Sequence, residues 1–404
     1  MTSLRRSAAI LIAGVPLALW GQAARAAFED LCEATTVAAS LTSVLQRAGA
    51  QASASGQGQS RASLRGDLTA TLAPSPGEGV DAQLFAHLRF GLGRGVTLQP
   101  TYSSSPSTLA FQPAEGDGTR RSYAIVAQAW GQLGVPLPAG DAVAAATQRL
   151  EFNLGKIDPF VFFDQNAVAD DESTRFMNNV LVHNPLLDSG GDVGADRYGF
   201  APGLRAAWQW RRAASWHGGL SLGIFGTGDT GDVSRALGRP FVIVQGELSS
   251  DASGQAGTVR VYAWTNPRAS GIDGSPRGHR GWGVSADRQA GERWRLFGRY
   301  GRRTGGQDRF DRALTLGAEW TGAARGGALG AALAWLPTGE AWRLAANADT
   351  ATAASGAERV AELYYRHAIN EHVELSPDVQ WIWRPAGRPS ASFAVLGLRA
   401  RLAF

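Results

Sequence analysis

The sequence has little cysteine, little lysine and, beyond its N-terminal segment, no long apolar run. The single cysteine, Cys32, excludes an internal disulfide. The single lysine, Lys156, makes the positive charge of the chain almost entirely arginine. Because no run of about 18 apolar residues follows the N-terminal segment, we expect no helix that spans an inner membrane.

The first 26 residues have the layout of a cleaved secretory signal. Arg5 and Arg6 precede an apolar run from Ala8 to Trp20, and Ala24-Arg25-Ala26 fits a cleavage site. Removing the three arginines of this segment from the 39 basic residues leaves 36 against 35 acidic ones. We therefore expect an exported protein that is periplasmic, secreted or in the outer membrane, and no nucleic-acid partner.

From Arg61 onward, apolar and polar residues alternate with a period of two. In residues 61–72 the apolar face carries Leu64 and Leu68, whereas Arg65 and Asp67 lie on the other face. Segments near 80–90, 149–154, 204–211, 293–300 and 396–404 alternate in the same way. A soluble β-sandwich also alternates, but segments of about ten residues with one apolar and one charged face are typical of a lipid-embedded barrel with a wet interior.

We assign sixteen strands, among them the first at 61–72, the third at 96–103, the fifth at 145–156 and the last at 390–404. Connections from odd to even strands, such as 73–79, would face outside and are longer on the whole than the others, such as 93–95. The pattern predicts an all-β fold, a transmembrane antiparallel β-barrel of about 16 strands in the outer membrane of a Gram-negative bacterium.

The chain before the barrel has a different composition. Residues 28–49 could form a short helix, and residues 51–60 form a linker rich in glycine, serine and glutamine. The predicted domains are therefore a signal peptide at 1–26, an N-terminal segment and linker at 27–59, and a porin barrel at 60–404.

The segment 157–197 interrupts the alternation with a long stretch rich in Asp, Asn and Phe. Such a long irregular connection is usually functional or disordered, and its four phenylalanines argue for an ordered loop. It follows the fifth assigned strand, so it would be the third external loop. We expect it to fold into the lumen and narrow the channel.

Three blocks of sequence resemble the signatures of one known family. They are GKIDPFVFFDQNAVADDESTRFMNN from Gly155, ELYYRHAINEHVELSPDVQWIWRP from Glu362, and the closing LGLRARLAF. They look like the corresponding parts of the OprB-type carbohydrate-selective porins, and the similarity extends over most of residues 60–404. The resemblance implies a monomeric outer-membrane barrel that admits sugars.

An acidic loop opposite a basic wall would set a transverse field across the constriction. Guanidinium groups suit the hydroxyl oxygens of sugars, and phenylalanine rings would cover the apolar faces of a pyranose. The loop candidates for substrate binding are Asp158, Phe160, Phe163, Asp164, Asp170, Asp171, Glu172 and Arg175. The inward arginines are Arg65, Arg89, Arg149, Arg205, Arg260, Arg295, Arg299 and Arg399. Alternatively, the acids cap turns or pair with arginine, the phenylalanines anchor the loop, and the arginines only solvate the lumen.

No catalytic, cofactor or metal site is expected. The hydrolase-like pattern at Gly219 to Gly223 continues as a strand rather than a strand-turn-helix, and the six histidines lack metal-ligand spacing. A calcium site among Asp170, Asp171 and Glu172 remains an alternative.

The predicted function is a porin that lets mono- or small oligosaccharides diffuse into the periplasm. The alternatives are a barrel that exports a polysaccharide and, less favoured, a barrel enzyme. The expected partners are small carbohydrates, outer-membrane lipid and lipopolysaccharide, and the barrel-assembly machinery through the C-terminal strand that ends at Phe404.

Overall fold

The computed structural model describes most of the chain beyond residue 32. The described residues are 33–52, 56–74, 79–98, 102, 105–110, 122–138, 146–196, 198–212, 215–227, 238–252, 255–323, 327–347, 354–389 and 392–404. The expected signal peptide and Cys32 lie outside them. Among the described residues, no helix has the length and apolarity needed to cross a membrane.

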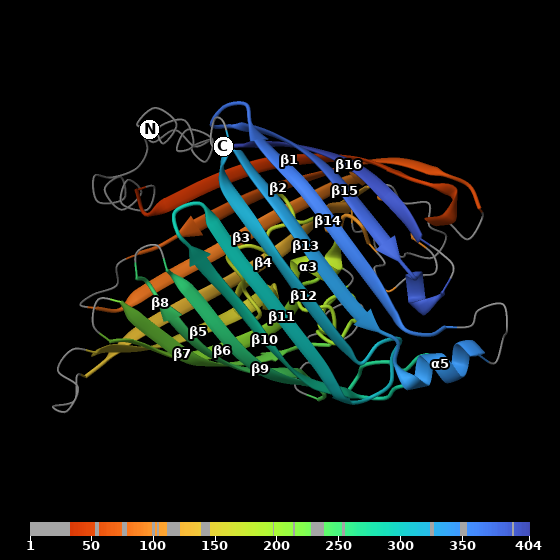
Figure 1. Ribbon diagram of the computed structural model, residues 1–404. Coiled ribbons are helices and arrows are strands. Elements are labelled where there is room, and N and C mark those ends of the chain that lie inside the picture. The colour runs from red at the N-terminus through yellow and green to blue at the C-terminus, as the bar shows by residue number, and fades with distance from the viewer. Residues whose placement is uncertain are drawn as a thin grey trace.

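Sixteen antiparallel strands form one closed barrel, in which each strand pairs with its neighbours in sequence and β1 closes the ring against β16 (Figure 1). The strands are β1 (Thr35–Ala48), β2 (Gln59–Leu72), β3 (Asp81–Gly93), β4 (Ser122–Leu137), β5 (Ala146–Ile157), β6 (Ala201–Arg212), β7 (Trp216–Phe225), β8 (Phe241–Ser250), β9 (Gly257–Asn266), β10 (His279–Ala290), β11 (Trp294–Gly305), β12 (Arg312–Ala323), β13 (Gly327–Pro337), β14 (Ala357–Ala368), β15 (Val373–Trp383) and β16 (Ser392–Ala403). The predicted all-β barrel of sixteen strands is confirmed.

Helical segments occur only in connections within the described part of the chain. They are η2 (Ala50–Ala52), η3 (Thr108–Ala110), η4 (Pro159–Val161), α3 (Asn179–Val182), α5 (Glu340–Asn347) and η7 (Pro385–Gly387). The hydrolase-like pattern at 219–223 lies within β7, so it is not a strand-turn-helix elbow.

The two faces of the barrel differ as the alternation predicts. Leucines of the apolar rows face outward and are exposed, for example Leu84 at 57% and Leu333 at 60%. Polar and charged residues, including Arg65, Gln245 and Glu362, face inward and are buried. The exposed apolar rows therefore form the surface that a bilayer requires of a barrel.

Strand β1 corrects the predicted helix at 28–49 and the predicted start of the barrel near residue 60. In this strand Thr42, Val44, Gln46 and Ala48 are buried, whereas Leu45 is exposed. Alanine and serine dilute the hydrophobic contrast of the strand, so its period of two is weak. The strand is nevertheless required, because a barrel in lipid tolerates no unpaired edge.

The predicted strand at 96–103 is wrong. Residues 94–98 are irregular, and Val96 and Leu98 are buried among the residues of the long connections. The assignment of connections to the two ends changes accordingly. The turn between β2 and β3, which includes the predicted outside loop 73–79, lies at the short-turn end of the barrel. The predicted short turn 93–95 belongs to the long connection between β3 and β4.

With this correction the connections at one end of the barrel are longer on the whole than those at the other end. At one end lie 49–58, 94–121, 158–200, 226–240, 267–278, 306–311, 338–356 and 384–391, and at the other lie 73–80, 138–145, 213–215, 251–256, 291–293, 324–326 and 369–372. We call these the long-loop end and the short-turn end. The segment 158–200 remains the third connection at the long-loop end.

Candidate functional site in the lumen

The segment 158–200 contacts inward side chains from strands all around the ring. Its residues bond to Arg65 of β2, Gln245 of β8, Tyr262 of β9, Arg299 of β11 and Arg399 of β16. None of these strands is a neighbour of β5 or β6, between which the segment is inserted. Strand side chains therefore hold it at many points.

The most buried of these contacts centres on Asp164, which the sequence singles out as a sugar ligand. Its carboxylate accepts hydrogen bonds from Nε of Arg299 at 3.1 Å, from the Tyr262 hydroxyl at 2.6 Å and from the backbone N–H of Asn184 at 2.6 Å. The side chains of Asp164 and Arg299 are both 0% exposed. Neither can contact a solute. For this pair the alternative role therefore applies, in which a loop acid pairs with arginine and anchors the loop.

A second buried anchor centres on Asp192. Its carboxylate accepts hydrogen bonds from Nη2 of Arg303 at 2.7 Å and from Nε1 of Trp264 at 2.9 Å. The same carboxylate lies 2.7 Å from Nδ1 of His279. None of these partners is among the residues predicted for the site from the sequence. Arg303 shares the inward phase of Arg295 and Arg299 along β11, which is the signal that would have identified it.

The middle of the segment is fixed by two further groups of contacts. Arg65 bonds to Glu172, and Arg399 donates to the backbone carbonyls of Glu172 at 2.9 Å and Arg175 at 2.6 Å. From β14, the carboxylate of Glu362 accepts the backbone N–H of Met177 at 2.5 Å. Arg65 and Arg399 therefore position the segment, and their side chains are almost fully buried.

The predicted aromatic sugar platform is corrected by the packing of the phenylalanines. Phe160 stacks on His183 with ring centroids 3.8 Å apart, Phe163 packs against Phe225, and Phe176 packs against Tyr364. Their side chains are buried, so they hold the segment together. Phe162 differs: it is only half-buried, and the guanidinium of Arg205 lies 4.6 Å from its ring centroid.

The remaining acids of the segment serve local turns or lie near histidine. Asp158 accepts the backbone N–H of Phe160 at 2.9 Å, and Asp171 accepts that of Ser173 at 2.9 Å. Burial raises the pKa of Asp158. Burial also acts on Asp171, but hydrogen bonds from Ser173 and Thr174 outweigh it and lower the pKa of this carboxyl.

Asp170 and His183 form a titratable pair. His183 Nε2 lies 3.6 Å from Asp170 Oδ1, and His183 Nδ1 lies 3.2 Å from Asp188 Oδ2. Burial raises the pKa of Asp170 to about 7. Burial alone would lower the pKa of His183, but its hydrogen bond to Asp188 and the charges of Asp188 and Asp170 raise it to about 9.

The predicted opposition of an acidic loop and a basic wall is also corrected. Acids on the strands lie among the inward arginines and pair with most of them, so the described inward residues do not form a wall of one sign. Arg65 and Arg89 both contact Asp67, Arg149 contacts Asp81, Arg205 contacts Glu151, Arg260 contacts Glu247 and Asp287, and Arg175 of the segment contacts Glu319. Arg295 lines a separate cavity of about 180 Å³.

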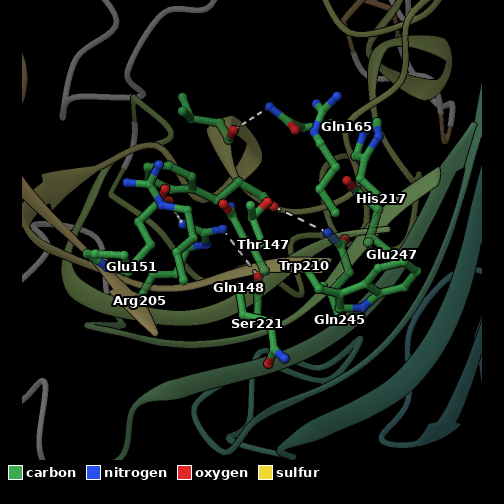
Figure 2. A pocket seen from close by; sticks show the side chains of 18 of the residues that line it. Thr147, Gln148, Glu151, Gln165, Arg205, Trp210, His217, Ser221, Gln245 and Glu247 are labelled. Carbon is green, nitrogen blue, oxygen red and sulfur yellow. Dashed lines mark hydrogen bonds and ion pairs between the residues drawn. The ribbon is translucent and has the colours of Figure 1, made fainter. Parts of the chain in front are cut away.

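A larger cavity of about 720 Å³ lies between the start of the segment and the inner faces of β5 to β8 (Figure 2). Figure 2 shows Glu151, Arg205, Gln245, Glu247 and Gln165 around this opening. Arg149 and Phe162 also border it. The structure thus brings two predicted arginines together with amide and carboxylate groups that the sequence analysis did not select.

Comparison with known proteins finds a family match over part of the chain. Residues 244–404, from β8 to the C-terminus, match the family model described as carbohydrate-selective porin, OprB family. No curated protein sequence matches the chain significantly.

Solved porin structures share the fold of this chain. The high-pH structure of Pseudomonas putida OprB has a TM-score of 0.68 at 15% identity, covering 95% of this chain and 97% of that chain. An anion-selective porin from Comamonas acidovorans has a TM-score of 0.51 at 13% identity, covering 92% and 99%. The fold shared with these porins is the closed antiparallel β-barrel.

Proposed function

We propose that mono- and small oligosaccharides pass through the lumen beside the segment 158–200, which narrows the channel, and bind weakly in the 720 Å³ cavity on the way. The long-loop end faces the outside of the cell and the short-turn end faces the periplasm. The observation that carries this proposal is the cavity between the segment and the strands. It is lined by hydrogen-bond donors and acceptors and by one accessible phenylalanine.

The lining chemistry suits a polyhydroxylated solute. Nη1 of Arg205 donates to Asn153 at 2.9 Å and also bonds to Glu151, whereas its Nε is buried without a hydrogen-bond partner among the described residues. Sugar hydroxyls both donate and accept, so they can bond to guanidinium, carboxylate and amide groups alike. The half-buried ring of Phe162 offers an apolar surface to a pyranose. Several weak contacts favour transport, because the solute must also leave.

The anchors of the segment favour small solutes over an exported polymer. A polysaccharide exporter would need a wide lumen and a loop that opens. In this protein the segment is fixed through Asp164 and Asp192, whose side chains are 0% exposed and paired with arginine. Breaking such a buried pair costs about 3–5 kcal/mol, which opposes repeated opening.

The decisive experiment measures the conductance of the purified full-length protein in planar bilayers with and without added glucose or maltose. A sugar-dependent block of the current supports the proposal. The absence of any pore would contradict it, as would a pore that is closed at rest and opens only for a long polymer.

One variant tests the role of the cavity. We expect Arg205→Gln to weaken sugar block about tenfold or more, because it removes charge-assisted hydrogen bonds worth about 1.5–3 kcal/mol each. Arg288→Gln is the matched control, since Arg288 is an exposed arginine on the outward face of β10 and hydrogen-bonds Gln255 at 3.2 Å. Equal block in the wild type and Arg205→Gln would show that Arg205 only fills the lumen.

A further inference from the structure

The outward face of β10 to β14 carries a concentration of arginine at the long-loop end. Arg280, Arg302, Arg312 and Arg359 are all exposed and lie in the outward phase of their strands. Arg302 is directly opposite Arg312, and Trp282 is directly opposite Arg302. We call these four arginines the outer arginine patch.

The outward side chains change in character from the middle of the barrel toward the patch. Exposed aliphatic side chains come first, such as Leu316 and Leu333, which are directly opposite each other. The next cross-strand row contains aromatic rings: Tyr300 is opposite Leu314, Leu314 is opposite Trp335, and Trp335 is opposite Arg359. Aromatic side chains of this kind mark the interface between hydrocarbon and head groups, so the arginines lie at head-group level.

The charges of the patch are poorly compensated by the protein. Arg280, Arg302 and Arg359 form no ion pair with another described residue, and Arg312 contacts only Asp311, at 3.3 Å. Like charges directly opposite on neighbouring strands are destabilising. The direct pairing of Arg302 with Arg312 therefore calls for an anion from outside the protein.

The backbone makes room for this arrangement at Gly305. A Cβ atom at this position would lie only 2.6 Å from Nε of Arg280. The side chain of Arg280 thus lies over Gly305 of β11, its cross-strand partner. A larger residue at this position would force the Arg280 side chain to shift.

We propose that the outer arginine patch binds the phosphate groups of lipopolysaccharide in the outer leaflet. This inference rests on the proposed sidedness, in which the long-loop end faces outside. Guanidinium groups bind phosphate oxygens in bidentate geometry. The aromatic and aliphatic rows below the patch would contact the acyl chains of the same molecule, whereas a free phosphate ion would need no such rows.

The test measures lipid binding to the full-length protein in detergent by native mass spectrometry. The probes are bisphosphorylated lipid A, dephosphorylated lipid A and inorganic pyrophosphate. We expect saturable binding of the phosphorylated lipid, and a loss of affinity of about tenfold or more in the triple variant Arg280→Gln/Arg302→Gln/Arg312→Gln, because each basic residue near the surface contributes to attraction of anionic lipid. Arg288→Gln, at the short-turn end, should retain wild-type affinity.

Three results would overturn the inference: equal affinity of the triple variant and the wild type, equal affinity for the dephosphorylated lipid, or competition by pyrophosphate at the same concentration as the lipid. Bilayer conductance separates this inference from the sugar channel. The triple variant should keep wild-type sugar block, since its substitutions face away from the lumen. A wild type that binds lipid A but shows no sugar block would contradict the channel proposal alone.

Discussion

At the scale of single residues, Asp164 shows how the segment 158–200 is fixed. Its φ of 57° lies in the left-handed region, which non-glycine residues rarely adopt. Its backbone and side chain together bond to Gln245, Tyr262, Arg299 and Asn184. The buried charge is tolerable only because a guanidinium and two neutral donors surround it.

Removing the guanidinium should release this part of the segment. We expect Arg299→Gln to destabilise the local structure by about 3–5 kcal/mol, since Asp164 would remain as a buried charge without its cation. The consequences would be higher single-channel conductance and faster proteolytic cleavage within residues 158–200. Both can be measured on the purified protein.

Arg295→Gln is a suitable control for this substitution. Arg295 lies four residues before Arg299 on β11 and faces the same side of the strand. It is exposed and forms no ion pair with a described residue. The double variant Asp164→Asn/Arg299→Met should recover part of the lost protection, because it removes both charges. Unchanged conductance and cleavage in Arg299→Gln would show that the remaining contacts suffice to hold the segment.

At the scale of elements, the segment 158–200 couples its stability to pH through Asp170 and His183. Both pKa values are raised in the folded protein, so the segment binds protons more tightly when it is in place. The stabilisation from Asp170 is lost as pH rises from 3.8 to about 7. That from His183 is lost as pH rises from 6.5 to about 9.

We therefore expect the segment to loosen in alkaline solution. Conductance should be higher, and sugar block weaker, at about pH 9.5 than at about pH 6, because both stabilising contributions have then been lost. His183→Gln should remove the part of this change above pH 7, since it lacks the titrating ring. A flat pH profile of the wild type, or an unaltered profile of the variant, would refute the coupling.

The strands could be predicted from the sequence where apolar and polar residues alternate clearly. Fifteen of the sixteen lie near predicted strands, because leucine, tryptophan and arginine alternate clearly in them. Strand β1 was missed because small residues such as Ala38, Ala39 and Ser40 blur the period. Residues 96–103 were misassigned because two buried loop residues, Val96 and Leu98, mimic that period.

The candidate site was less predictable than the fold. The sequence indicated which acids and arginines face the lumen, but not which of them meet. Asp164 pairs with Arg299 and Asp192 pairs with Arg303, each across more than a hundred residues of chain. Such partners depend on the path of an irregular segment, which no periodicity describes.

At the scale of the whole molecule, β1 is the element that completes the ring. It pairs with β2 along its full length and with β16 from Ser40 to Ala48. Without it, β2 and β16 would each expose unpaired backbone groups to lipid, which costs several kcal/mol per group. The barrel therefore requires β1 in order to close.

This requirement can be tested by deletion. Removing residues 35–52 should abolish the folded barrel, seen as loss of the heat-modifiable band in gel electrophoresis of membranes. Removing residues 271–275, from the connection between β9 and β10, should leave that band in place because every strand is retained. A heat-modifiable band that persists after the first deletion would mean that the ring closes without β1.

The seam between β1 and β16 also brings the first and last strands of the chain together. The backbone N–H of Ala39 donates to the carbonyl of Phe404 at 3.1 Å, and the reverse bond is 2.9 Å long. Each neighbouring pair of strands in the ring is joined by a similar ladder of backbone hydrogen bonds. The pairing of the first strand with the last therefore does not differ from the other pairings. A circularly permuted gene, opened at any short turn and joined across this seam, would encode the same cylinder.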